Sequence, residues 1–114
     1  MLKICKHPLI DVKLSIMRDS KTKSKEFRES LDEIGSLMTY EVFIDLEVVD
    51  SDDKMLLPTG VILRKRKLVN KIIVVPILRA GLGMVDCVNN MIPTAKVGHI
   101  GLERDEETLK PREY

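Results

Sequence analysis

The sequence predicts the α/β class, with N-terminal helices followed by part of a parallel sheet. Two observations lead to this prediction. Up to about residue 46, apolar residues recur at helical spacing. Residues 71–102 then have the pattern strand, turn, helix and strand. A helix that joins two strands of one sheet makes them parallel, and such crossovers are nearly always right-handed.

The first expected elements are a short strand at about 2–5 and a helix at about 9–18. Pro8 separates them, because proline fits the first turn of a helix better than a strand. His7 is expected to organise that first turn. One face of the helix carries the apolar residues Leu9, Val12 and Ile16.

A longer helix is expected over about 24–46, with Ser24 as its N-cap. Its buried stripe consists of Phe27, Leu31, Ile34, Leu37, Met38 and Val42. An acidic turn at 50–53 and a third, short helix at about 59–68 follow. They complete a helical region that extends to about residue 70.

The strand–helix–strand unit begins with the β-branched run Ile72–Val75, which is typical of a strand buried on both faces of a parallel sheet. The expected strands cover about 71–78 and 95–102. Between them lie a turn at 79–81 and a helix at about 82–92, which Pro93 ends.

Both predicted strands end beside an arginine, Arg79 after the first and Arg104 after the second. Ligands of open α/β sheets bind at the carboxyl ends of the strands, and guanidinium groups pair well with phosphate oxygens. Ala80 and Gly81 let backbone N–H groups approach the same anion. The pattern therefore predicts a site for a multiply charged anion. From spacing alone, two solvated strand-end arginines are an equally good interpretation.

Composition excludes several other classes. A net charge of +1, 4% aromatic residues and no Trp argue against a nucleic-acid partner. Cys5 and Cys87 have neither metal-ligand nor redox spacing, so we expect two reduced thiols and no metal site. No stretch approaches the roughly 20 apolar residues that span a membrane. A cytoplasmic protein is expected.

Two segments resemble one enzyme family. VVPILRAGLGMVD at 74–86, followed by PTAKVGHIGLERDEETLKPREY at 93–114, is similar to the uracil phosphoribosyltransferases. HPLIDVKLSIMRD at 7–19 and EFRESLDEIGSLMTYE at 26–41 resemble that family's N-terminal helices. The resemblance spans the chain except for about 44–70. It implies the type I phosphoribosyltransferase fold, of which residues 1–114 would be the N-terminal, incomplete portion of a single domain with a doubly wound parallel sheet.

The resemblance also implies a reaction, the joining of uracil to 5-phosphoribosyl-1-pyrophosphate (PRPP) with Mg²⁺ in pyrimidine salvage. Its products are uridine monophosphate (UMP) and pyrophosphate. Arg79, Ala80 and Gly81 would bind the pyrophosphate of PRPP, beside a cis peptide bond near Leu78–Arg79. Arg104 would lie at the root of a flexible arm that closes over it. Mg²⁺ would arrive with PRPP, and no catalytic residue or metal ligand is assigned in this chain. A dimer is implied, and GTP is a candidate effector because some members respond to it.

The chain departs from the family pattern in what it lacks. The acidic and Thr/Gly-rich loop that holds the 5-phosphate, and the uracil pocket, would follow Tyr114. The segment LEVVDSDDKMLLPTG at 46–60 imitates that loop only superficially. We therefore expect a truncated, inactive piece of the enzyme. The sequence does not distinguish a natural truncation from an artificial one.

Two alternatives stay open. One is a non-catalytic module that binds anions or dimerises. The weaker one is a Rossmann-type nucleotide binder, which the missing G-x-G-x-x-G disfavours. The basic run Arg64, Lys65, Arg66 and Lys67 is interpreted as a solvated face or a nucleotide site.

Overall fold

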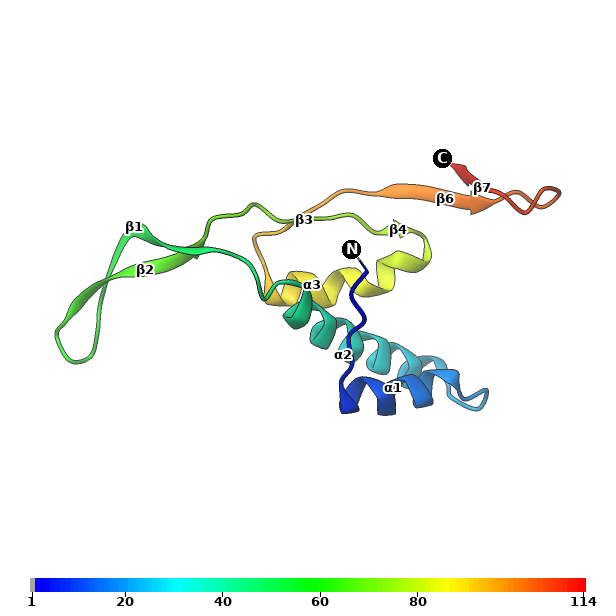
Figure 1. Ribbon diagram of the computed structural model, residues 1–114, viewed down its shortest axis with the longest axis horizontal. Coiled ribbons are helices and arrows are strands. Elements are labelled where there is room, and N and C mark those ends of the chain that lie inside the picture. The colour runs from blue at the N-terminus through cyan, green and yellow to red at the C-terminus, as the bar shows by residue number, and fades with distance from the viewer. Residues whose placement is uncertain (1) are drawn as a thin grey trace.

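The computed structural model describes residues 2–114 and has helices on one side of a narrow sheet, from which a β-hairpin and a shorter arm project (Figure 1). Its extents are 65 × 33 × 27 Å and its radius of gyration is 18.9 Å. A compact domain of this length has a radius of gyration of about 13 Å. Much of the chain therefore lies outside the core. Among residues 2–114, no helix is both long and apolar enough to cross a membrane.

Helix α1 (Pro8–Arg18) lies where the sequence predicts a helix, but Leu9 and Val12 of its expected apolar face are exposed, and Ile10 is its buried residue. The His7 side chain caps it, because its Nδ1 atom accepts a hydrogen bond of 3.1 Å from the Leu9 N–H. This confirms the expected role of His7 in the first turn. The strand expected at 2–5 is wrong: residues 2–7 have no regular secondary structure, and no described strand pairs with them.

Helix α2 (Ser24–Val42) packs against α1 and buries Ser30, Ile34, Gly35 and Thr39. Its N-cap is Lys23 rather than Ser24, and it ends four residues earlier than expected. Phe27 and Val42, at the two ends of the expected buried stripe, are exposed. The hydrogen-bond ladder tightens at the end, where the Ile44 N–H donates to the Glu41 carbonyl three residues back. Such short-range bonds are common in a last helical turn.

The third helix expected at 59–68 and the acidic turn expected at 50–53 are both wrong. Residues 48–68 form an antiparallel hairpin of β1 (Val48–Leu56) and β2 (Ile62–Leu68), which projects from the molecule (Figure 1). The helical region therefore ends at Val42. The segment that imitates the 5-phosphate loop lies in β1 and the hairpin turn.

Opposite charges face each other across this hairpin. Arg66 lies 2.8 Å from Asp50, and Arg64 lies 3.5 Å from Asp52. Cross-strand pairs of opposite charge favour the antiparallel pairing, although exposed pairs contribute little each. The basic run therefore belongs to a strand, and its two arginines are engaged with the acidic strand.

The sheet confirms the predicted parallel arrangement. The first strand has two short parts, β3 (Ile73–Val74) and β4 (Ile77–Leu78), and the second has β5 (Lys96–Val97) and β6 (Ile100–Arg104). β3 pairs in parallel with β5, and β4 with β6. A third strand, β7 (Pro111–Glu113), returns antiparallel along β6. The α/β class is therefore confirmed, with N-terminal helices before the sheet.

The connection between the parallel strands is a 3₁₀ turn, η1 (Ala80–Met84), followed by α3 (Val85–Met91). Both pack on α2 beneath the sheet (Figure 1). The small core is formed by Ile10, Ile34, Cys87 and Ile92. The Cys87 thiol donates to the Met84 carbonyl at 2.7 Å, and burial, with the Asp32 charge second, raises its pKa.

Gly35 lets α2 and α3 approach closely. A Cβ atom at this position would overlap the Cys87 Sγ atom and lie 3.3 Å from the Cys87 Cβ. We expect Gly35→Ala to lower the free energy of unfolding by about 1–3 kcal/mol, the usual cost of overpacking a core. Urea denaturation measures this.

The control for Gly35→Ala is Gly98→Ala, whose added methyl group would meet its nearest atom at 3.9 Å. We expect that control to change stability by less than about 1 kcal/mol. Adding Cys87→Ala to Gly35→Ala should restore part of the lost stability, because the sulfur atom no longer occupies the space. Equal losses for Gly35→Ala and Gly98→Ala would contradict this account of the helix contact.

Candidate functional site

The predicted anion loop lies directly after β4, at the carboxyl end of the first parallel strand. Arg79 follows Leu78 across a cis peptide bond, as the family resemblance implies. Arg79 and Ala80 are exposed, so both are accessible to a ligand. The loop is closed by the Leu82 N–H, which donates to the Arg79 carbonyl at 3.1 Å.

Gly81 allows the loop to fold back on its own strand. A Cβ atom there would lie 3.3 Å from the Pro76 Cβ and 3.4 Å from the Pro76 backbone. Because Pro76 is buried, it has little room to move. A small residue at position 81 therefore keeps the backbone of Ala80 and Gly81 at the end of the strand.

A hollow of about 590 Å³ lies beside this loop and includes Arg79, Ala80 and Gly81 in its wall. The rest of the wall is apolar and comes from the first strand, η1, α3 and Leu102. Arg79 is the only charged residue among those that line it. A guanidinium and backbone donors beside apolar walls fit an anion.

Arg104 ends β6, the neighbouring parallel strand. Leu78 pairs with Gly101, and Arg104 follows three residues later. At about 3.3 Å per residue, its Cα lies about 10 Å farther along the sheet than the pair. Both arginines thus lie at the carboxyl ends of adjacent parallel strands, as predicted.

The structure does not bring the two arginines into one hollow. Arg104 lines a separate hollow of about 300 Å³ with Glu103, Leu109 and Pro111, and Leu102 is the residue that both hollows share. The expectation that Arg79 and Arg104 face a single crevice is therefore not met in this arrangement. Bringing them together requires the arm to move.

The arm is the hairpin of β6 and β7 with the turn between them. Arg112 is ion-paired with Glu103 across the hairpin. In the turn, the Asp105 carboxylate accepts hydrogen bonds from the Thr108 N–H at 2.8 Å and the Glu107 N–H at 3.0 Å. These bonds, with Thr108 the largest contributor, hold the pKa of Asp105 below its ordinary value.

Sequence reasoning missed the role of Asp105. The signal was available, since an aspartate followed by polar residues is typical of a turn in which the side chain accepts from the backbone. The packing of Tyr114 on Gly101 was missed as well. A Cβ atom at Gly101 would lie 2.6 Å from the Tyr114 carbonyl oxygen, so the glycine lets β7 fold back there.

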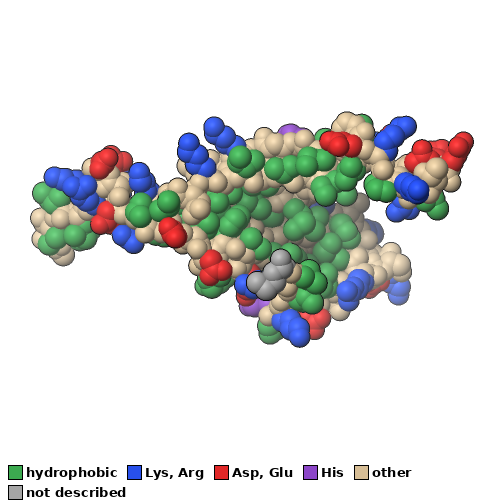
Figure 2. Space-filling model, turned by 45° about the horizontal axis from the view of Figure 1, so that its top comes forward, with side chains coloured by type: hydrophobic (Ala, Val, Ile, Leu, Met, Phe, Trp, Pro, Cys, Tyr) green, Lys and Arg blue, Asp and Glu red, His purple; other side chains and the backbone are tan. Residues whose placement is uncertain are grey.

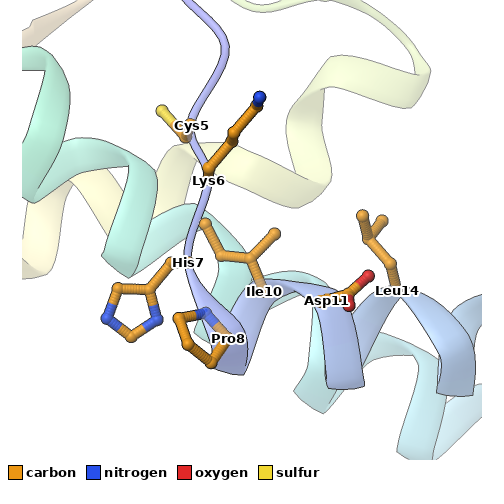
Figure 3. A pocket seen from close by; sticks show the side chains of 7 residues that line it. All are labelled: Cys5, Lys6, His7, Pro8, Ile10, Asp11 and Leu14. Atoms are coloured by element: carbon orange, nitrogen blue, oxygen red, sulfur yellow. The ribbon is translucent and has the colours of Figure 1, made fainter.

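A different hollow, of about 430 Å³, lies beside the N-terminal segment and α1 (Figure 3). Its polar side chains do not converge, and those of Lys6 and His7 point in opposite directions from the chain (Figure 3). His7 is already engaged as the helix cap. Within residues 2–114, no group of three or more His, Cys, Asp and Glu side chains could hold a metal ion.

Helices beneath a parallel sheet, with a basic loop at the carboxyl end of one strand, define an α/β protein with a candidate phosphate-binding loop. The chain belongs to the uracil phosphoribosyltransferase family, whose pattern matches residues 4–114.

Individual relatives agree with this assignment. The uracil phosphoribosyltransferase of Mycoplasma mobile is 47% identical over 114 residues, which are 100% of this chain and 54% of that protein. The one from Clostridium beijerinckii is 57% identical over 110 residues, 95% of this chain and 51% of that protein. The solved structure of the AQ2163 protein from Aquifex aeolicus superimposes with a TM-score of 0.86 at 34% identity. That match covers 100% of this chain and 54% of the solved one. The chain spans about half the length of these relatives.

Proposed function

We propose that this chain provides the pyrophosphate-binding part of a uracil phosphoribosyltransferase, which forms UMP and pyrophosphate from uracil and PRPP. The observation that supports the proposal best is the Arg79–Ala80–Gly81 loop at the carboxyl end of β4, in a chain of this family. The curated relatives are named for that activity.

The chemistry of the loop suits the proposed reaction. Breaking the bond between ribose and pyrophosphate leaves additional negative charge on the departing group. Arg79 is exposed and can place its guanidinium against that charge, while the backbone N–H groups of Ala80 and Gly81 donate to it. Donors that are already in place stabilise a developing charge without reorganising. The apolar wall of the hollow strengthens these interactions by excluding water.

Arg104 has a second, later role in this proposal. Arg104 is the last residue of β6, in the arm, and it lines a different hollow from Arg79. Closure of the arm over bound PRPP would add its guanidinium to the pyrophosphate and exclude water from the reacting bond. Mg²⁺ brought with PRPP, GTP regulation and dimerisation stay predictions from the family resemblance, and a cytoplasmic location stays a prediction from the sequence.

A chimaera tests the proposal. This chain replaces the segment that it matches in the Mycoplasma mobile relative, so that the remaining part of that protein completes the fold. We expect the folded chimaera to form UMP from labelled uracil and PRPP. The unmodified relative is the control for the assay. A chimaera with the relative's circular dichroism and melting behaviour but no product would contradict the proposal.

The alternative is a module that binds anions or dimerises without catalysis. It predicts that the isolated chain binds pyrophosphate and that the chimaera is inactive. Both functions expect the isolated chain to bind pyrophosphate, so the activity of the chimaera distinguishes them.

A further inference from the structure

The arm runs past the end of the parallel sheet. β4 ends at Leu78, which pairs with Gly101, whereas β6 continues to Arg104 (Figure 1). Past that pair, β7 is the one described strand beside β6. Figure 2 shows this end of the molecule as a projection that carries charged side chains of both signs. A two-stranded ribbon is only marginally stable in water, so the shape of the arm depends on the bonds within it.

The ladder of the arm does not hold Arg104 directly. Arg104 faces Pro111, whose nitrogen has no hydrogen to donate. The next pair outward is bonded, because the Asp105 N–H donates to the Lys110 carbonyl at 2.9 Å. Bonded and unbonded pairs alternate along an antiparallel ladder, so the pair of Arg104 and Pro111 is unbonded. The position of Arg104 therefore depends on its bonded neighbours in the chain.

Asp105, the neighbour on the outer side, closes the tip of the arm. Its Oδ1 atom accepts from the Thr108 N–H at 2.8 Å and from the Glu107 N–H at 3.0 Å. Its carbonyl accepts from the Leu109 N–H at 2.9 Å. Leu109 has a φ of 57°, a left-handed conformation that costs free energy in leucine. The bonds to Asp105 offset that cost and keep the turn closed.

The neighbour on the inner side is held more weakly. Glu103 is ion-paired with Arg112, but the two side chains are 44% and 67% exposed, and exposed pairs contribute little. The bonds to the Asp105 carboxylate are charge-assisted, which makes them stronger than neutral ones. Among residues 102–114, Asp105 is half-buried and all the others are exposed. Asp105 is therefore the main structural support of the arm beyond the sheet.

We propose that Asp105 is a positioning residue for Arg104. The turn that its carboxylate closes keeps β6 extended up to Arg104, so that the closing arm presents the guanidinium in one orientation. A long side chain on an ordered strand reaches one place, whereas the same side chain on a frayed end samples many. Direct contact of Asp105 with pyrophosphate is unfavourable, because both groups are negative and Oδ1 is engaged with two N–H groups. The assignment rests on the proposed function, in which Arg104 meets the pyrophosphate of PRPP.

Three variants of the chimaera test the assignment. Asp105→Ala is expected to lower kcat about fivefold or more and to change KM for PRPP less than about twofold, because the arm acts after PRPP is bound. Asp105→Asn keeps an acceptor oxygen for the same two N–H groups and should restore kcat to within about twofold. Glu106→Ala is the matched control, since it removes the same charge from an exposed position of the same turn. It should change kcat less than about twofold.

A double-mutant cycle shows whether Asp105 acts through Arg104. Adding Asp105→Ala to Arg104→Ala should lower kcat less than about twofold further, because the side chain to be positioned is already gone. A general loss of structure would instead multiply the two effects. Amide exchange on this chain gives a reading that does not need activity. Asp105→Ala should lower the protection factor of the amide at position 105 about threefold or more, and Asp105→Asn should retain it.

Several results would overturn the assignment. These are a kcat of Asp105→Ala within twofold of the unmodified chimaera, equal losses in Asp105→Ala and Asp105→Asn, equal losses in Asp105→Ala and Glu106→Ala, or multiplied losses in the double variant. An inactive chimaera would contradict the proposed function, and the exchange measurement then decides on the positioning role. Lost protection at position 105 in Asp105→Ala supports that role, and unchanged protection overturns it.

Discussion

Arg79→Ala in the chimaera is expected to lower kcat/KM for PRPP. The fall should correspond to a loss of about 2–4 kcal/mol of transition-state stabilisation, the scale for losing one preorganised donor to a developing charge. Arg79 is the only charged residue in the wall of its hollow, so no neighbouring cation in that wall can replace it. Steady-state kinetics with varied PRPP, at saturating uracil and Mg²⁺, measures the change.

Two further variants sharpen the test of Arg79. Arg64→Ala removes an exposed arginine from β2 and should change kcat/KM less than twofold. Arg104→Ala should lower kcat more than it raises KM, because the arm acts after PRPP is bound. Kinetics of Arg79→Ala and Arg104→Ala within twofold of the unmodified chimaera would contradict the assignment of both residues.

The chain alone is expected to form no measurable UMP. Its candidate site holds a leaving group, whereas a transfer reaction also needs the ribose and the uracil ring in place. Correct positioning of reactants supplies about 7–11 kcal/mol in well-oriented reactions. Losing most of that contribution leaves a rate equal to the uncatalysed background. Labelled uracil with PRPP and Mg²⁺, followed by nucleotide separation, is the measurement.

The chimaera serves as the positive control for that experiment. Product from the purified chain, after its mass has been verified and host enzyme excluded, would show that the catalytic groups have been misplaced. Calorimetry with pyrophosphate on the same sample adds a second reading. We expect the chain to release heat on binding pyrophosphate and the Arg79→Ala variant to release none. This is the behaviour of a chain that binds the leaving group without turnover.

The sequence predicted where the helices and parallel strands lie along the chain better than which of their faces are buried. Apolar periodicity placed α1 and α2 correctly along the chain, but not all of their expected apolar faces: Leu9 and Val12 of α1 and Phe27 and Val42 of α2 are exposed. The β-branched run before Arg79 and the helix stopped near Pro93 predicted the parallel strands correctly, although Ile73 and Val75 are exposed and the strand is not buried on both faces.

The hairpin could not be predicted in this way because it has little buried surface to impose a pattern. All seven residues of β2 are exposed, so neither helical nor strand periodicity marks them. Its determinants are a non-local charge pair, Asp50 with Arg66, and a local turn of Pro58, Thr59 and Gly60. Gly60 adopts a φ of 87°, which glycine reaches without strain. An acidic segment and a basic segment joined by proline and glycine indicate a hairpin. This signal is lost when the two segments are interpreted separately.

The candidate site was predicted in its residues but not in its geometry. Strand ends place Arg79 and Arg104 on the same side of the sheet, and that much follows from topology alone. Their separation depends on how far β6 runs past Leu78 and on where β7 folds back, where the Asp105 turn and the close approach of Tyr114 to Gly101 lie.

The contact between Cys87 and Gly35 makes one thiol a reporter of breathing motions. Cys87 is 1% exposed, so a thiol reagent reaches it only while α2 and α3 are apart. Thiolate is the reactive form, and burial raises the Cys87 pKa, which slows reaction further in the closed state. Cys5 is half-buried and reacts without that opening. The ratio of the two labelling rates therefore counts how often the helix pair beneath the sheet separates, in a chain whose core is small enough for such events to be frequent.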